Sequence, residues 1–541
     1  RSSMTDNTTG NQNTAIGRKA LQVNTTGNHN AACGAFSLDA NTTGGNNTGM
    51  GYAALTANTT ADNNVAVGYQ CLKANTTGTS NTAVGANALD ANTTASNNTA
   101  VGLNALGATT TGSANTAVGQ NCLDANTTGV NNAAFGRLSL SENTTGDQNT
   151  AVGSSALYVN TTADNNTAVG YNCLGANTTG HSNVAVGSEA LDANTTGGSN
   201  TAVGRSSLGA NTTGADNTAL GYEAIDANST GNNNTALGRS SLGANTTASN
   251  NVAVGYHALK VNTTGASNVS VGTFALDANT TGDYNVAIGD GCLTAATTAD
   301  RNTAMGRYAG FSITTGAENA IVGYQAMYNS TTATDCVAMG DHALSSCTTG
   351  TKNTGIGRAI GGTLTTGSHN TLIGSEANVS TADAGHQNVL GRNVTGSGNS
   401  TFTFGSGSDD TTCSNGGTTW SAPSDERMKE EITTSIAGLS FINDLRPVTF
   451  KWKKEKDIPS TLSSYVEGSE KRYKTDLTQH GFIAQEVKTV IDAHSEIKDG
   501  FDMWREDDKD GRQRIGDGAL IPILVKAIQE LSTEVEALKA A

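Results

Sequence analysis

The polar and apolar positions of residues 1–391 repeat with a strict period of 17 residues. Glycine stands at every multiple of 17 from Gly17 to Gly391, which makes 23 repeats without an insertion or deletion between these glycines. The residue before each glycine is apolar, and Leu stands four residues after most of them. Asn stands four residues before the glycine without a break from Asn13 to Asn319. This pattern is typical of a solenoid in which each repeat forms one coil.

The repeat predicts short β-strands rather than helices. Seventeen residues cannot hold a helical hairpin, which needs about 33. The unit from Asn81 to Asn97 instead holds two β-prone segments, Thr-Ala-Val-Gly and the residues around Leu89, separated by Asn, Thr and Gly turns. Stacked coils place like residues about 4.7–4.9 Å apart, so we expect Asn ladders and an interior of Leu, Val and Ala. We therefore predict a mostly β fold, a parallel β-solenoid or β-roll, whose small Ala and Gly face suits close approach at a threefold axis.

Composition divides the chain near residues 392–423. Residues 1–423 carry 13 Lys and Arg against 24 Asp and Glu, whereas residues 424–541 carry 18 against 23 in a much shorter stretch. All three Trp and all four Pro lie at or beyond residue 420. We predict a shaft over 1–391, a neck or linker rich in Gly, Ser and Thr over 392–423, and a small α+β domain over 424–541.

The overall composition excludes several classes of protein. A net charge of -16 argues against a nucleic-acid partner. No apolar run approaches 18 residues, so we expect no membrane span. No Cys or His spacing suits zinc, the repeats hold no paired carboxylates in a constant frame for a glycan-degrading enzyme, and we expect no metal and no cofactor. The chain opens with Arg1 rather than Met, so we expect its natural N-terminus to be missing.

Other repeated features have structural interpretations. The many Asn-Thr-Thr triplets match a glycosylation sequon, but a ladder at fixed period explains them more simply. Cys71, Cys122 and Cys173 are 51 residues apart and replace the Ala before Leu, which predicts free buried thiols. Rows of Thr leave ice binding open as a minority alternative.

The C-terminal segment carries the candidate chemistry. It begins Ser-Asp-Glu-Arg-Met-Lys over residues 424–429 and later reads Gly-Phe-Ile-Ala-Gln-Glu-Val over 481–487. Apolar spacings of three predict a helix over 436–445, ended by Pro447, and alternation predicts a strand over 448–453. The acidic stretch 506–511 predicts a hairpin turn rather than a calcium loop. A heptad from Ile521 to Leu538 predicts a terminal coiled coil over about 520–540.

Both segments resemble known families. The repeat resembles the head repeats of trimeric autotransporter adhesins and, more closely, the repeat arrays of phage and marine bacterial tail-fibre proteins. The motif Ser-Asp-x-Arg-x-Lys-x-x-Ile, followed downstream by Gly-x-Ile-Ala-Gln-Glu-Val, resembles the self-cleaving intramolecular chaperone that ends endosialidase-type tailspikes and phage fibres. That chaperone also occurs in a eukaryotic membrane-bound transcription regulator. The resemblance spans about 390 residues of the shaft and essentially all of 420–541.

The chaperone resemblance implies the roles of individual residues. It makes Ser424 the nucleophile and Lys429 its base, with cleavage between Pro423 and Ser424. A Ser hydroxyl needs such a base at neutral pH, and a nearby positive charge such as Arg427 would favour the neutral lysine. His480 is a candidate assistant. We expect Gln485 and Glu486 to organise the fold or the trimer rather than to react. The enzyme would turn over once, on itself, with no external substrate.

The resemblances together imply a homotrimeric virion tail fibre. Its C-terminal domain would trimerise first, align three chains in register and then cleave itself off. The fibre would attach to a host cell-surface receptor or glycan and join other tail proteins through the missing N-terminus. The alternative is a bacterial surface adhesin or an ice-binding rod, located outside the cell, with a borrowed chaperone domain.

Overall fold

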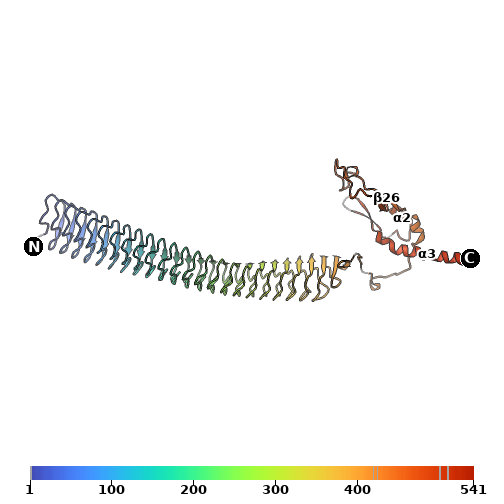
Figure 1. Cartoon of the computed structure of the whole chain (residues 1–541), viewed down its shortest axis with the longest axis horizontal. Coiled ribbons are helices and arrows are strands. Elements are labelled where there is room, and N and C mark those ends of the chain that lie inside the picture. The colour runs from blue at the N-terminus through green and yellow to red at the C-terminus, as the bar shows by residue number, and fades with distance from the viewer. Residues whose placement is uncertain (1–2, 418, 423, 499–500, 508–510) are drawn as a thin grey trace. The chain divides into compact units, whose positions relative to one another are not determined.

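The computed structural model describes residues 3–417, 419–422, 424–498, 501–507 and 511–541 (Figure 1). The chain forms two compact units, Arg1–Pro423 and Ser424–Ala541. The first is a parallel β-solenoid and the second a small domain of helices and two-stranded sheets, so the predicted fold class is confirmed.

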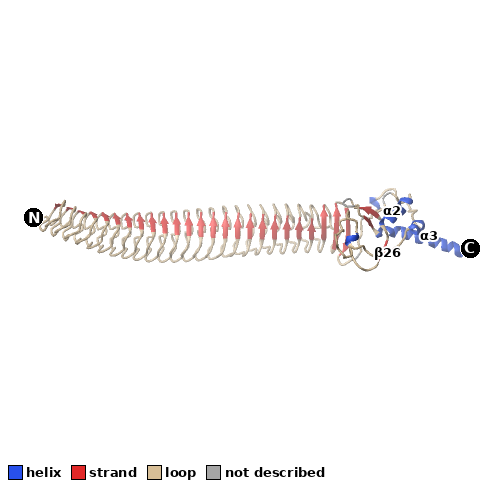
Figure 2. Cartoon of the chain, turned by 90° about the horizontal axis from the view of Figure 1, so that it is seen from above, coloured by secondary structure: helices blue, strands red, loops and turns tan. Residues whose placement is uncertain are grey.

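The solenoid places one three-residue strand in each coil, and successive strands lie side by side in a single row (Figure 2). Every pair is parallel and in register with the residue 17 positions on, as in Thr82↔Thr99 and Val84↔Val101. The strands of the repeats are β1 (Thr14–Ile16), β2 (Ala31–Cys33), β3 (Thr48–Met50), β4 (Val65–Val67), β5 (Thr82–Val84), β6 (Thr99–Val101), β7 (Thr116–Val118), β8 (Ala133–Phe135), β9 (Thr150–Val152), β10 (Thr167–Val169), β11 (Val184–Val186), β12 (Thr201–Val203), β13 (Thr218–Leu220), β14 (Thr235–Leu237), β15 (Val252–Val254), β16 (Val269–Val271), β17 (Val286–Ile288), β18 (Thr303–Met305), β19 (Ala320–Val322), β20 (Val337–Met339), β21 (Thr354–Ile356), β22 (Thr371–Ile373) and β23 (Asn388–Arg392).

The periodic glycine is required at the corner after each strand. Gly204 has φ +132°, a backbone conformation that side chains with a Cβ rarely adopt. A Cβ on Gly204 would lie 2.4 Å from the carbonyl oxygen of Gly221, the same corner of the next coil. Because each corner stacks on the next one, a side chain at this position would push two coils apart. This contact explains why the glycine period has no exception.

Two ladders of buried Asn side chains run through the stack, as predicted. In the first, the backbone N–H of Asn47 donates to Oδ1 of Asn30 (3.0 Å), and Asn47 Nδ2 donates to the carbonyl of Ala61 (2.8 Å). In the second, Nδ2 of Asn58 donates to Oδ1 of Asn41 (2.9 Å). The second ladder consists of the Asn of the Asn-Thr-Thr triplets, and Asn41 and Asn58 are fully buried. The triplets are therefore structural, because an amide inside the stack is closed to a modifying enzyme.

The interior differs from the prediction in one respect. The Ala in the middle of each strand and the Leu four residues after the glycine are buried, as in Ala83 and Leu89. The apolar residue directly before the glycine faces outward instead, and Leu220 and Leu237 are each 44% exposed. Side chains alternate along a strand, so the inward Ala forces both of its neighbours out. The small residues thus fill the solenoid and cannot form a face at a threefold axis, and the predicted interior position of Val is wrong.

The cysteines confirm the expectation of free thiols. All eight are unpaired, and Cys71, Cys122 and Cys173 are buried in the core. Burial raises the pKa of Cys71 and of Cys173 to about 12 and that of Cys122 to about 11. Cys33 lies in an outward position before a glycine and is exposed.

The last parallel strand of the shaft is followed by a strand of opposite direction. Strand β24 (Thr401–Ser406) pairs in parallel with β23. Strand β25 (Asp409–Ser414) folds back and pairs antiparallel with β24. Both lie within the segment predicted as a neck, and they extend the sheet to 25 strands.

The C-terminal unit packs three helices and two short hairpin sheets around one small core. The core consists of Ala437, Phe441, Leu445, Val487, Ile491, Met503, Leu520 and Ile523. The elements are η1 (Glu426–Met428), α1 (Leu439–Asp444), β26 (Val448–Phe450), η2 (Glu455–Asp457), β27 (Gln479–Gly481), α2 (Ala484–Ala493), β28 (Trp504–Glu506), β29 (Gln513–Ile515), η3 (Asp517–Ala519) and α3 (Leu520–Ala540). β26 pairs with β27, and β28 with β29, both antiparallel.

Several predicted elements are shorter than expected. Helix α1 begins at Leu439 rather than near Ile436, whose side chain is exposed. The predicted strand 448–453 is limited to the three residues of β26. The acidic stretch joins the hairpin β28–β29, with residues 508–510 outside the described part of the chain. Helix α3 occupies the predicted heptad as one 21-residue helix.

Helix α3 has two apolar faces. Leu520, Ile523 and Ala527 are buried against its own domain. The heptad residues are exposed in the single chain; they are Ile521, Leu524, Ile528, Leu531, Val535 and Leu538. The heptad seam is thus a separate surface that the domain itself does not cover.

Candidate functional site

Ser424 and Lys429 are brought together by one tight turn. Between them lies the 3-10 helix η1, which begins when the Asp425 carboxylate accepts a hydrogen bond from the backbone N–H of Arg427 (2.9 Å). The turn closes with the N–H of Lys429 donating to the carbonyl of Glu426 (3.1 Å). As a result, Nζ of Lys429 donates a hydrogen bond to Oγ of Ser424 at 2.7 Å. This is the distance at which a neutral amine could accept the hydroxyl proton along the same contact.

Arg427 is engaged elsewhere in the same turn. Its guanidinium pairs with the Asp425 carboxylate, with Nε 2.9 Å from Oδ1. This contact holds the pKa of Asp425 below its usual value and raises that of Arg427. The structure therefore places Arg427 on Asp425, where it stabilises the turn, and its charge is balanced by a neighbouring carboxylate.

The other predicted site residues lie on later elements. His480 is the exposed middle residue of β27, opposite Thr449, and Gln485 lies in the first turn of α2. Glu486 forms an ion pair with Arg446, whose Nε lies 3.0 Å from Oε2, and this contact lowers the pKa of Glu486. Among the described residues, no hydrogen bond joins His480, Gln485 or Glu486 to the Ser424–Lys429 pair. Pro423, the predicted residue before the cleaved bond, lies outside the described residues.

Residues 424–496 match the family model described as chaperone of endosialidase. The matched segment begins at the serine of the Ser424–Lys429 contact and contains α1, β26, β27 and α2. No curated protein and no solved structure matches the chain. The endosialidase-chaperone match therefore covers the small C-terminal unit and leaves the shaft to be judged from its own structure.

The endosialidase-chaperone segment also contains a histidine cluster that the sequence did not indicate. His494 is 9% exposed, and its Nδ1 lies 2.8 Å from Glu496 and its Nε2 2.9 Å from Asp444. The ring also packs edge-on against Phe441, with centroids 5.3 Å apart. Hydrogen bonds to Glu496 and Asp444 raise the pKa of His494, and the same contact lowers the pKa of Glu496. The cluster ties the end of α2 to α1.

We expect the stability of this domain to depend on pH through His494. A histidine whose pKa is raised in the folded state contributes stability below its unfolded pKa of about 6.5, and that contribution is lost as pH rises through the folded pKa. His494→Gln should therefore lower the unfolding temperature at pH 5.5 by on the order of 3 °C and change it much less at pH 8.5. Thermal unfolding followed by Trp fluorescence measures this, with the exposed His480→Gln as control. An equal loss at both pH values would contradict the protonation argument.

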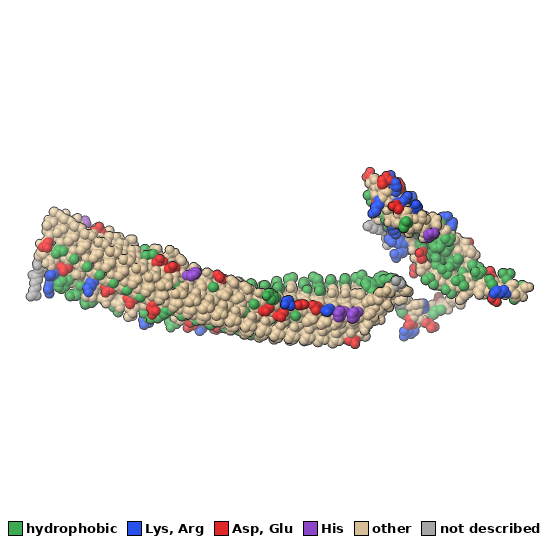
Figure 3. Space-filling model, viewed as in Figure 1, with side chains coloured by type: hydrophobic (Ala, Val, Ile, Leu, Met, Phe, Trp, Pro, Cys, Tyr) green, Lys and Arg blue, Asp and Glu red, His purple; other side chains and the backbone are tan. Residues whose placement is uncertain are grey.

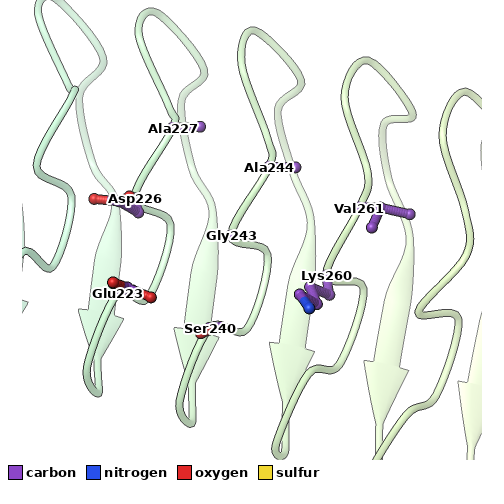
Figure 4. Close-up of a pocket in the computed structure, with 8 residues that line it drawn as sticks. All are labelled: Glu223, Asp226, Ala227, Ser240, Gly243, Ala244, Lys260 and Val261. Carbon is purple, nitrogen blue, oxygen red and sulfur yellow. The ribbon is translucent and has the colours of Figure 1, made fainter.

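The shaft carries a shallow groove of about 330 Å³ on its surface. It opens at Gly243, which has no side chain to fill the space, between Asp226 and Lys260 of the neighbouring coils, with Glu223 beside them (Figure 4). Burial, together with the charge of Glu223, raises the pKa of Asp226. No group of three or more His, Cys, Asp or Glu suited to a metal occurs here or elsewhere in the described part of the chain. Of the helices described, none is long and apolar enough to cross a membrane.

Proposed function

We propose that this chain is the shaft of a homotrimeric fibre whose C-terminal domain directs assembly and then cleaves itself off between Pro423 and Ser424. The observation that carries the proposal is the 2.7 Å hydrogen bond between Lys429 Nζ and Ser424 Oγ at the start of a segment that matches the endosialidase chaperone. In domain terms, we propose the shaft as 1–391, the neck as 392–423 and the chaperone autoprotease as 424–541.

The proposed cleavage is an intramolecular acyl transfer followed by hydrolysis. Lys429, as the neutral amine, takes the proton of Ser424 Oγ, and Oγ forms a bond to the carbonyl carbon of Pro423. The bond from that carbon to the Ser424 nitrogen breaks, and the proton passes to this nitrogen, which becomes a free α-amino group. Water then hydrolyses the ester and leaves a carboxylate on Pro423 and the hydroxyl on Ser424. The missing N–H of Pro423 does not hinder the reaction, because the leaving nitrogen belongs to Ser424.

Denaturing mass analysis of the purified protein tests the proposal. Two fragments that separate between residues 423 and 424 would support self-cleavage. An intact chain after prolonged incubation of the folded protein would contradict it and leave a retained cap in its place.

The trimer is supported by an apolar row that the single chain leaves uncovered. The outward residues before the periodic glycines form this row, and apolar side chains line one edge of the shaft (Figure 3). We propose that two further copies of the shaft cover it, because parallel rows of the same period match coil for coil. The exposed heptad seam of α3 would join the same copies as a terminal coiled coil.

Charges in this row are expected to prevent shaft assembly. Leu220→Lys together with Leu237→Lys places six ammonium groups around the proposed axis, so we expect the mass of the cleaved shaft to fall from that of three chains to that of one. Sedimentation measures this, and Thr213→Lys with Thr230→Lys, exposed elsewhere on nearby coils, is the matched control. Cys33 stands in the same row, so assembly should also protect its thiol from alkylation. A parent shaft that sediments as one chain, or a variant that stays trimeric, would contradict this interface.

We further propose that the fibre belongs to a virion and attaches to a host cell surface, through a receptor or glycan, with other tail proteins at its opposite end. A rigid solenoid with a removable C-terminal domain suits such a role. The second candidate is an extracellular adhesin or ice-binding rod, which is favoured by the exposed second Thr of the triplets, as in Thr43, Thr77 and Thr94. Thermal hysteresis of the mature shaft would support ice binding, and its absence would remove that candidate.

A further inference from the structure

The last coil of the shaft ends in an aromatic contact three residues before the reacting serine. Phe404 stands opposite Leu390 in the register of β24 with β23, so it continues the outward apolar row. Trp420 packs edge-on against Phe404 and Phe402, with ring centroids 5.3 and 5.7 Å apart. These contacts join residues of β24 to a segment that follows β25 in the chain.

The backbone beside Trp420 is held as well. Ser421 and Thr412 of β25 exchange two hydrogen bonds, each 2.9 Å long between nitrogen and oxygen. The chain is therefore fastened to the end of the shaft at residues 420 and 421. The fastening surface consists of Phe402, Phe404 and Thr412, which come together only when β24 and β25 have paired.

We propose that Trp420 is a positioning residue that couples self-cleavage to completion of the shaft. The inference rests on the proposed function. The turn of η1 already places Oγ of Ser424 against Lys429, on the C-terminal side of the bond. The carbonyl that is attacked belongs to residue 423, whose preceding residues are held by the shaft. Acyl transfer requires the nucleophile and the carbonyl in a narrow range of orientations.

The coupling follows from which residues must fold first. Before β24 and β25 pair, Trp420 has no surface to pack on, and the carbonyl side of the bond rotates freely about the backbone. After they pair, the anchor removes much of that freedom. Cleavage is therefore slow on an unfinished shaft and fast on a finished one, which keeps the chaperone attached until its work is complete.

The test measures the first-order rate at which the folded full-length chain separates into two fragments. We expect Trp420→Ala to slow cleavage by about 10–100-fold and Trp420→Phe, which retains an aromatic ring, to restore most of the rate. Tyr171→Ala, which removes an exposed aromatic side chain from the middle of the shaft, is the matched control and should cleave at the parental rate. Phe402→Ala combined with Trp420→Ala should be no slower than the worse single variant, because both remove one contact.

The outcomes separate the two proposals. Parental cleavage in Trp420→Ala, or no rescue by Trp420→Phe, would overturn the anchoring role while self-cleavage stood. A parent that never cleaves would overturn both. Shaft circular dichroism and native mass, measured on each variant, should match the parent; a variant that slows cleavage only by losing shaft structure or assembly would count against a positioning role.

Discussion

Ser424→Ala is expected to leave every chain at its full length of 541 residues. The substitution removes the oxygen that accepts the hydrogen bond from Lys429, and no other hydroxyl in the described residues makes that contact. Loss of the nucleophile from such a pair abolishes its covalent chemistry, so we expect a rate reduced by at least about 10³-fold. Denaturing mass analysis during incubation of the folded protein gives the rate directly.

Lys429 provides the matched control for this experiment. Lys429→Met keeps much of the side-chain length but removes the amine, and Lys429→Arg keeps a cation that does not give up its proton. Both should leave the chain intact while the fold is preserved, because Ser424 and Lys429 are exposed and outside the hydrophobic core. Cleavage that persists in both lysine variants but not in Ser424→Ala would show that another group is the base.

The largest loss of stability is expected from an alanine at a periodic corner. Gly204→Ala places a Cβ 2.4 Å from the carbonyl oxygen of Gly221 and strains a backbone at φ +132°. Strain of this kind costs about 1–3 kcal/mol, and the backbone contact adds to it, so we expect a loss of at least about 3 kcal/mol. Each coil contacts only its neighbours, so the damage should divide the stack into two parts that melt separately.

Thermal unfolding by circular dichroism measures the effect of this corner. Gly362→Ala is the control, because a Cβ there meets its nearest atom only at 3.8 Å and the backbone has no positive φ. An equal unfolding temperature for both variants would refute the stacking explanation of the glycine period.

The period alone predicted the coil, the parallel register and the Asn ladders, because all three follow from stacking identical units. It did not predict which apolar positions face outward. Within Thr82–Val84, both Ala83 and Val84 are apolar, so the pattern lacks the alternation that marks an inner and an outer face. Val84 is apolar on the outside, which is the composition of a surface that a partner covers.

The C-terminal unit shows a similar division. The motif indicated Ser424 and Lys429, and the turn between them explains the spacing. The start of α1 could not be read from its apolar spacing, because Leu439 donates its N–H to Glu530 of α3, 91 residues away (2.8 Å). Gly438 allows this approach, since a Cβ there would lie 2.4 Å from the Glu530 carboxylate. His494 escaped notice for the same reason: its partner Asp444 is 50 residues away.

The reversed direction of β25 has a consequence for solubility. A stack of parallel strands ends in unpaired N–H and C=O groups that can template the addition of another chain, as in amyloid growth. Here that edge of β24 is occupied by β25, and an antiparallel strand offers the wrong register for a further coil. Released from its chaperone, the shaft would therefore keep a blunted end that does not seed end-to-end polymers.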